Sequence, residues 1–234
     1  VTDLPVEEVI DELRSALAQR LTAVLVAPPG AGKTTLIPLR LINEEWLNGQ
    51  RIVMLEPRRL AARAAARRLA SLIGQEPGEL VGYQTRDERR IGPNTRIEVV
   101  TEGILTRRLQ NDPELPGIGL VIFDEVHERN LPTDVGLALC LDARKNLRPD
   151  LRVLAMSATA DTDRFAKLLG DTEPAPIISS AGRQHPVDIT WTPTGKQQRL
   201  DDAVVDVTMR ALRENVGDIL VFLPGIGEIN RVQQ

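Results

Sequence analysis

Several residue types that commonly mark a site or a compartment are scarce in this chain. Its 234 residues include one cysteine, two histidines and 3% aromatic residues. This composition leaves no disulfide framework and no metal site built from cysteine and histidine. The apolar runs stay well below the roughly 18 residues that a membrane-spanning helix needs, and the first residues are acidic. We therefore expect a cytoplasmic protein with no membrane partner.

The remaining composition is that of a globular protein. Apolar residues make up 42% and charged residues 26% of the chain, which suffices for a sizeable core. The length fits one large domain, or one domain and part of a second. Cys140 lies in an apolar helical pattern and is expected to be a buried core residue rather than a nucleophile, and Trp46 and Trp191 are interpreted as packing residues.

The charge is distributed unevenly along the chain. The net charge is −4, yet residues 51–108 contain 12 arginines and seven acidic residues. A region with this excess of positive charge could face phosphate groups although the whole protein is acidic.

Short apolar runs alternate with helical patterns over most of the chain. Strands are expected in six segments, which are TAVLVA, RIVMLEP, RIEVVTEG, LVIFDEV, RVLAMSAT and DILVFLPG. Helices are expected over residues 5–20, 33–45, 58–73, 103–111, 133–147 and 161–169. This alternation predicts an α/β fold, a parallel sheet covered by helices on both faces. Ligands of such sheets bind at the carboxyl ends of the strands.

A shift in composition predicts a domain boundary near Gly182. The segment around it is rich in proline, serine and threonine. Residues 1–182 are expected to form the first domain, and residues 183–234 a linker and the incomplete start of a second. We expect one or two strands after the boundary, a helix from about 196 to 215, and then the strand DILVFLPG.

The stretch APPGAGKTT, residues 27–35, has the pattern of a phosphate-binding loop between a strand and a helix. Glycines allow consecutive backbone N–H groups to turn toward a phosphate, and the helix adds its positive end. Lys33 would reach the β- and γ-phosphates and Thr34 would hold Mg²⁺. Ala27 replaces the first glycine of the strict pattern, and the alternative is an incidental turn. The expected nucleotide-binding residues are Pro29, Gly30, Ala31, Gly32, Lys33, Thr34 and Thr35.

A pair of carboxylates ends another apolar strand, in LVIFDEVHER. Asp124 can hold Mg²⁺ and Glu125 can orient and deprotonate an attacking water, a combination typical of NTP hydrolysis. Taken alone, adjacent acids after a strand are more often the start of a solvated loop. Thr34, Asp124 and Glu125 are the expected metal-site residues.

The ordered set of motifs resembles superfamily 2 helicases of the DEAH group. APPGAGKTT resembles motif I, EPRRLAARAAARR motif Ia, TEGILTRRL motif Ib, DEVHER motif II, SAT motif III and ILVFLPGIGEI motif IV. The resemblance covers essentially the whole chain. It implies a RecA-like P-loop domain, the start of a second RecA-like domain, ATP or another NTP with Mg²⁺ as ligands, and ATP hydrolysis coupled to movement along RNA.

The resemblance also implies roles for individual residues. Lys33, Asp124, Glu125 and His127 would be catalytic, and Arg68 would stack on the base of the nucleotide. Ser157, Ala158 and Thr159 would couple the nucleotide state to nucleic acid, together with Thr101, Glu102, Gly103 and Arg107. Val126 replaces the usual alanine and should pack inward. Motifs V and VI, with their arginines, are not found before Gln234, so we expect weak hydrolysis and a need for missing carboxyl-terminal domains.

Arginines in the expected helix 58–73 support a nucleic-acid partner. Arg59, Arg63 and Arg67 recur at helical spacing beside Arg58, and Arg107 and Arg108 lie in a second such segment. Contacts with the backbone of a single strand would be independent of base sequence, and the few aromatic residues limit base stacking. A solvated helix face is the alternative. RNA is favoured over DNA by the resemblance alone. For the segment GYQTRDERR, the sequence does not decide between a functional role and a simple surface turn.

Two other functions remain alternatives at this point. A P-loop kinase would need an acceptor pocket and a lid, for which the sequence shows no sign. A nucleotide-dependent switch would bind its partner differently with ATP and with ADP, without unwinding nucleic acid.

Overall fold

A computed structural model describes residues 4–159, 162–182, 186–195 and 198–234. The chain divides into two compact units, Val1–Gln184 and His185–Gln234. Each unit is described by itself below.

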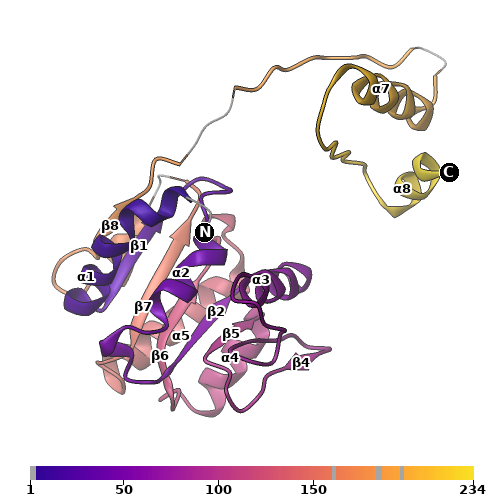
Figure 1. Cartoon of the computed structure of the whole chain (residues 1–234). Coiled ribbons are helices and arrows are strands. Elements are labelled where there is room, and N and C mark those ends of the chain that lie inside the picture. Colours follow the sequence, from indigo (N-terminus) through magenta and orange to yellow (C-terminus); the bar gives the residue numbers. More distant parts are fainter. Residues whose placement is uncertain (1–3, 160–161, 183–185, 196–197) are drawn as a thin grey trace. The chain divides into compact units, whose positions relative to one another are not determined.

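The first unit is built on one eight-stranded sheet with the order β4-β3-β5-β2-β6-β7-β1-β8 (Figure 1). Every neighbouring pair is parallel except β3 and β4. The strands are β1 (Thr22–Val26), β2 (Arg51–Leu55), β3 (Val81–Gln84), β4 (Arg89–Arg90), β5 (Ile97–Val100), β6 (Ile118–Phe123), β7 (Arg152–Ser157) and β8 (Ile177–Ser179). The predicted parallel sheet is therefore confirmed.

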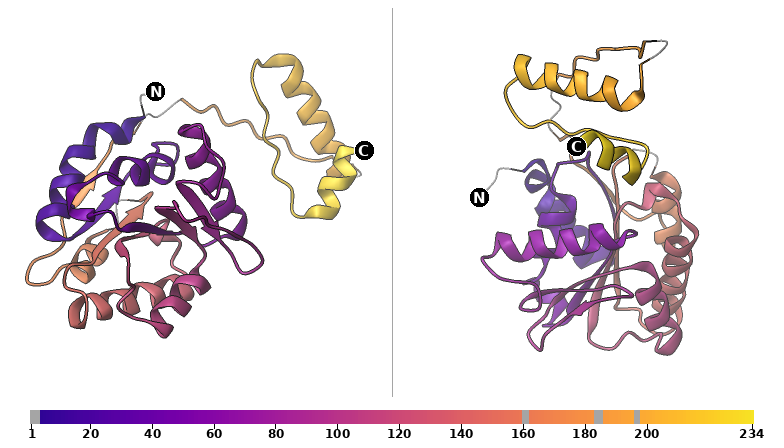
Figure 2. Two further views of the ribbon diagram at one scale, coloured as in Figure 1. Left: turned by 60° about the horizontal axis from the view of Figure 1, so that its bottom comes forward. Right: turned by 90° about the vertical axis from the view of Figure 1, so that its right-hand side faces the viewer.

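Helices cover both faces of this sheet, as the side view in Figure 2 shows. The α-helices are α1 (Ile10–Arg20), α2 (Lys33–Leu41), α3 (Arg59–Leu72), α4 (Glu102–Asn111), α5 (Leu131–Asn146) and α6 (Asp163–Leu169). Short 3₁₀ turns are η1 (Pro5–Val9), η2 (Glu45–Leu47) and η3 (Val126–Glu128). The predicted helices are observed within a few residues of their expected ends, a normal uncertainty for helix termini.

The side chains of each strand point alternately to the two faces of the sheet, where they form two separate apolar cores. In β2, Ile52 and Met54 point into the cluster beneath α1, α2 and α3. Val53 and Leu55 point into the cluster beneath α4, α5 and α6. Successive side chains of a strand point to opposite faces, so a strand buried on both faces needs a continuous apolar run, which explains why these strands are visible in the sequence.

The parallel arrangement brings several loops to one edge of the sheet. β1, β2, β6 and β7 are neighbours or near neighbours and run in the same direction. Their carboxyl ends lead into the residues after Val26, Leu55, Phe123 and Ser157. The segments with the suspected phosphate and metal chemistry therefore meet at this edge.

Three single-residue predictions have clear outcomes in the first unit. Cys140 is fully buried, as predicted, and burial raises the pKa of its thiol to about 12. Val126 is also buried, as predicted. Trp46 packs against the first core, as predicted, and the guanidinium of Arg152 lies 4.4 Å from its ring centroid. No helix in the described part of the chain is long and apolar enough to cross a membrane.

The second unit differs from the prediction. Its regular elements in the described residues are two helices, α7 (Leu200–Glu214) and α8 (Ile226–Gln233). The strands predicted after Gly182 and over residues 218–225 are wrong for the described residues, which form none there. A strand requires a hydrogen-bonding neighbour, and no strand in the described part of the chain pairs with this segment. Leu220 and Phe222, which a sheet would cover, are 78% and 86% exposed.

The predicted packing role of Trp191 is also wrong. Its side chain is 89% exposed and lies in a segment without helix or strand. Packing requires an apolar surface opposite the indole ring, and the described residues around Trp191 provide none.

Candidate active site

The phosphate-loop segment forms the expected turn between β1 and α2. Gly30 and Gly32 have φ angles of 79° and 99°, which residues with a Cβ rarely adopt. Gly32 is the N-cap of α2, so Lys33 and Thr34 begin the helix. The free backbone N–H groups of this first turn and the helix dipole together favour an anion here.

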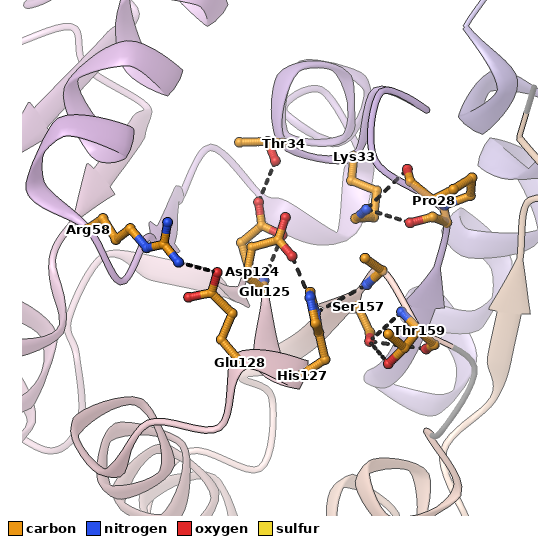
Figure 3. Close-up of polar contacts among 12 residues, drawn as sticks. Pro28, Lys33, Thr34, Arg58, Asp124, Glu125, His127, Glu128, Ser157 and Thr159 are labelled. Atoms are coloured by element: carbon orange, nitrogen blue, oxygen red, sulfur yellow. Dashed lines mark hydrogen bonds and ion pairs between the residues drawn. The ribbon is translucent and has the colours of Figure 1, made fainter. Parts of the chain in front are cut away.

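Lys33 is buried, although it carries a charge. Its Nζ donates hydrogen bonds to the carbonyl oxygens of Ala27 and Pro28, at 2.5 and 3.4 Å (Figure 3). Among the described residues, no carboxylate lies within ion-pair distance of this ammonium. A buried cation without an anionic partner is costly, and the phosphates of a nucleotide would supply that partner.

Asp124 lies directly opposite the phosphate loop at the end of β6. It is fully buried, and its Oδ2 accepts a hydrogen bond from the Thr34 hydroxyl at 2.5 Å. Its Oδ1 accepts one from the backbone N–H of Glu125 at 2.8 Å. Burial raises the pKa of Asp124, while the Thr34 hydrogen bond opposes that shift. Thr34 and Asp124, which are 90 positions apart in the sequence, thus place their side-chain oxygen atoms next to each other.

Glu125 has an unusual backbone conformation. Its φ and ψ angles are 51° and 38°, in the left-handed region, where a residue with a side chain is strained. Burial raises the pKa of its carboxyl, and the neighbouring charge of Asp124 raises it further. A carboxylate with a raised pKa is better matched to accept a proton near neutral pH.

His127 joins the segment after β6 to the segment after β7. Its Nδ1 accepts a hydrogen bond from the backbone N–H of Ala158 at 3.3 Å and lies 3.3 Å from Oε2 of Glu125. Nδ1 can accept from Ala158 only when it carries no proton, whereas it must carry one to donate to Glu125. The imidazole can therefore serve one neighbour or the other.

The SAT segment at the end of β7 is held by its own side chains. The Ser157 hydroxyl donates to the carbonyl oxygen of Thr159 at 3.1 Å and accepts from the Thr159 N–H at 3.2 Å. Ser157 is buried. Figure 3 shows this segment and His127 on the same side of the Asp124 carboxylate, so the structure brings these predicted residues together.

Glu56 is a residue of this site that was not predicted from the sequence. It follows β2 directly and is 5% exposed, and it lies within hydrogen-bonding reach of Asp124. Burial, followed by the charge of Asp124, raises the pKa of Glu56 to about 9. One signal in the sequence could have identified it. Glu56 is an acidic residue between an apolar strand and Pro57, and that strand ends at the same edge of the sheet as the strands before the phosphate loop and before Asp124.

Two clefts share the residues Thr34, Thr35, Arg68 and Glu125. One has a volume of about 290 Å³ and lies over the phosphate loop, where Leu4, Pro29, Gly30, Gly32 and Lys33 also line it. The other, of about 440 Å³, runs along α3 and is also lined by Glu56, Pro57, Arg58, Ala61, Ala64, Ala65 and Glu128. The exposed Arg68, predicted from the resemblance to stack on the base, borders both clefts.

The arginines expected to contact nucleic acid are mostly in ion pairs. Arg58 pairs with Glu128 at 2.7 Å, which joins the start of α3 to the loop after Asp124. The remaining pairs connect α3 with the turn before β4, Arg59 with Asp87 at 2.5 Å and Arg63 with Glu88 at 3.3 Å. Arg59, Arg63 and Arg67 therefore form a basic stripe on α3, and the turn in the segment GYQTRDERR partly neutralises it.

The predicted residues around α4 separate into buried and accessible groups. Arg108 pairs with the buried Glu98 at 2.7 Å and is turned toward the sheet, whereas Arg107 is exposed. Gly103 is also exposed, and Thr101, the N-cap of α4, is buried. Glu102 accepts a hydrogen bond from the Thr133 hydroxyl at 2.9 Å, which ties α4 to α5.

Comparison with known proteins agrees with these observations. The model of the DEAD/DEAH box helicase family matches residues 7–168. Over all 234 residues the chain is 51% identical to the ATP-dependent RNA helicase HrpB of Escherichia coli (strain K12), and covers 28% of that protein.

Two crystal structures of E. coli HrpB also match the fold. One, described as a DEAH/RHA helicase, has a TM-score of 0.88 over 99% of this chain and 29% of its own. The other, described as a DExH-box NTPase, has a TM-score of 0.77 over 100% of this chain and 28% of its own. The identity with both is 51%, and the present chain spans less than a third of the relatives that it matches.

Proposed function

Since the chain belongs to the DEAD/DEAH box helicase family, we propose that its RecA-like first unit binds ATP with Mg²⁺ and contributes to ATP hydrolysis. The observation that carries the proposal is the 2.5 Å contact between the Thr34 hydroxyl and the Asp124 carboxylate. It joins the phosphate loop to the DEVH segment at one point, beside the buried ammonium of Lys33.

The side chains at this point fit a magnesium ion. The described residues contain no group of three or more His, Cys, Asp or Glu side chains that could hold a metal. Mg²⁺ in nucleotide sites needs no such group, because it keeps several waters and uses one or two carboxylates with the phosphates. Thr34 and Asp124 would hold the ion, with Glu125 beside it, and the ion would neutralise charge that develops on the phosphates.

The proposed reaction is in-line attack of water on the γ-phosphate. Glu125 accepts a proton from the attacking water, the new bond forms between the water oxygen and γ-phosphorus, and the bond to the bridging oxygen of ADP breaks. Lys33 turns its donors from backbone carbonyls to the β- and γ-phosphates. Gly30, Ala31, Gly32 and the other loop residues surround the phosphates, and Arg68 stacks on the base. His127, with Ser157, Ala158 and Thr159, couples this state to nucleic acid.

Single-stranded RNA is the proposed partner, in a cytoplasmic protein. Arg58, Arg59 and Arg107 would contact phosphates, with Thr101, Glu102 and Gly103 at the start of α4. Such contacts do not depend on base sequence, and DNA would present the same backbone charge. Residues 1–182 are proposed as the ATP-binding domain and residues 183–234 as a linker and the start of a second RecA-like domain.

Full turnover and strand separation are proposed for a longer protein. The chain corresponds to 28% of the relative, and arginines from further domains would stabilise the charge on the γ-phosphate. Removing such an arginine lowers turnover by about 10³-fold or more. Hydrolysis by the 234 residues alone should therefore be weak.

The test is ATP hydrolysis with and without single-stranded RNA, by this chain and by a version extended to the length of the relative. Glu125→Gln in the extended version should lower turnover by about 10²–10⁴-fold and leave Mg²⁺–ATP binding intact. Leu168→Ala, on the exposed part of α6, is the control and should leave turnover unchanged. If the extended version hydrolyses ATP slowly, and neither RNA nor Glu125→Gln changes the rate, the result would instead support a nucleotide-dependent switch.

A further inference from the structure

The residues that precede α1 touch the phosphate loop, and the proposed reaction does not use them. This N-terminal segment, residues 4–9, consists of Leu4 and the 3₁₀ turn η1. It precedes Gly32 by more than 20 positions, and no motif includes it. Its contacts with the loop and with the helix that follows it are of three kinds.

The first contact is steric and involves Gly32. A Cβ built on Gly32 would lie 2.8 Å from Cδ1 of Leu4 and 3.3 Å from Cγ1 of Val6. The first distance is shorter than any van der Waals contact. Leu4 and Val6 therefore fill the space beside the Cα of Gly32, so a larger residue there would have to displace Leu4 and would also be strained by the φ angle of 99°.

The second contact is a hydrogen bond between backbones. The N–H of Val6 donates to the carbonyl oxygen of Ala31 at 3.2 Å. Val6 is fully buried, so this bond lies in a dry environment and fixes the orientation of the Ala31 peptide. The same peptide contains the N–H of Gly32, one of the groups that must point at a phosphate.

The third contact reaches the helix that follows the loop. Arg40, at the end of α2, donates from Nε to Oε2 of Glu7 at 3.2 Å, and its Nη2 pairs with Oε1 of the same carboxylate. Both side chains are partly buried. The carbonyl oxygen of Arg40 also accepts a bond from Arg14 of α1 at 3.1 Å. The N-terminal segment thus holds both ends of the unit formed by the loop and α2.

Leu4 also faces the nucleotide side of the loop. It is partly buried and lines the 290 Å³ cleft beside Pro29, Gly30 and Lys33. A bound nucleotide would therefore meet an apolar wall at Leu4, next to the loop that surrounds its phosphates.

We propose that the N-terminal segment is a positioning element for nucleotide binding. It keeps the phosphate loop in the conformation that receives phosphates, and Leu4 adds an apolar wall to the cleft. A loop that is ordered before binding loses less entropy when the ligand arrives, so its affinity is higher. This inference rests on the proposed binding of nucleotide at the loop.

The test compares Leu4→Ala with Val9→Ala by calorimetric titration of the folded chain with Mg²⁺–ADP and with inorganic phosphate. Val9 belongs to the same segment and packs against the same core, but it is not among the residues that line either cleft. Leu4→Ala should raise the Kd for ADP about fivefold to tenfold, and Val9→Ala by less than about twofold. Leu4→Met, which restores apolar bulk, should recover most of the affinity.

Thermal unfolding without nucleotide separates the loss of affinity from a loss of fold. The two alanine variants should lower Tm by similar amounts, because each removes a partly buried apolar side chain from the same core. Equal Kd values for the Leu4→Ala and Val9→Ala variants would overturn the inference. A wild-type chain that binds no ADP would overturn the proposed function instead, so the two failures are distinguishable.

Discussion

Glu56 shows how the site controls the charge of a single residue. Three carboxyl groups, those of Glu56, Asp124 and Glu125, lie together at the ends of two adjacent strands. Because negative charges repel one another, three neighbouring carboxyl groups cannot all be ionised at low cost in free energy. With a pKa of about 9, Glu56 is protonated at neutral pH, which removes one negative charge from beside Asp124.

Replacing Glu56 with glutamine should make the stability of the protein less sensitive to pH. The folded-state pKa of about 9 exceeds the ordinary value of 4.5, so the folded state binds more protons between these values. Wild-type stability due to this group is therefore fully present below about pH 4.5 and decreases as pH rises toward 9. Glu56→Gln retains the shape but does not titrate, so the variant should gain more than about 1 kcal/mol over wild type between pH 5 and pH 8.

Urea unfolding at several pH values, without Mg²⁺ or nucleotide, measures this difference. Asp150→Asn is the control, because Arg148 lowers the pKa of that carboxyl. This variant should be less stable than wild type by a constant amount between pH 5 and pH 8, and the difference should shrink only at acidic pH. Parallel stability curves for wild type and Glu56→Gln between pH 5 and pH 8 would contradict the assignment.

At the scale of elements, α3 and the turn before β4 hold opposite charges against each other. The pair Arg59–Asp87 is largely exposed and the pair Arg63–Glu88 is partly exposed, and ion pairs near the surface contribute about 1 kcal/mol or less. The phosphates of a nucleic acid can therefore replace these carboxylates at small cost. If this face binds RNA as proposed, the acidic turn should lower the affinity of the α3 arginines for it.

Neutralising the acidic turn should strengthen RNA binding. The double variant Asp87→Asn, Glu88→Gln should bind single-stranded RNA several-fold more tightly at low salt, because two competing carboxylates are removed. Arg59→Ala should weaken binding and reduce the salt dependence by about one released counterion. Fluorescence anisotropy at a series of salt concentrations measures both effects.

Arg20→Ala is the matched control for these charge changes. Arg20 ends α1, directly before β1, and pairs with Glu173, so it lies at the opposite edge of the sheet from the candidate site. Its removal should leave RNA affinity nearly unchanged. An equal loss of affinity for Arg20→Ala and Arg59→Ala would show that binding reflects general charge rather than α3.

Some elements of this protein are easier to predict from the sequence than others, for physical reasons. Strands buried on both faces have continuous apolar runs, and the glycines and Lys33 of the phosphate loop form a pattern that ordinary turns rarely contain. The ion pairs of Arg58 and Arg59 depend on distant residues, so their partners are not readable from local patterns. The strand predicted over 218–225 failed because apolar character alone does not supply a neighbouring strand.

At the scale of the whole molecule, the two cores of the first unit are complete within it. Every residue of both apolar clusters lies between Val6 and Ile178. The candidate site residues lie within the same range, from Pro29 to Thr159. The described residues of the second unit contribute to neither cluster, so folding and nucleotide binding should not depend on them.

A version of the protein ending at residue 182 should therefore fold and bind nucleotide. We expect one cooperative unfolding transition, and a Kd for Mg²⁺–ADP within about twofold of the longer chain. Differential scanning calorimetry and calorimetric titration provide the two measurements. Loss of the cooperative transition in the shortened protein would show that the second unit supports the first.

The apolar residues between α7 and α8 affect how the isolated chain behaves in solution. Ile219, Leu220, Val221 and Phe222 form an apolar run that no strand among the described residues pairs with, and two of its side chains are more than three-quarters exposed. Unpaired backbone beside apolar side chains is a template for strand addition between molecules. The 234-residue chain should consequently self-associate at high concentration, and Leu220→Lys would be a simple way to keep it dispersed for crystallisation or spectroscopy.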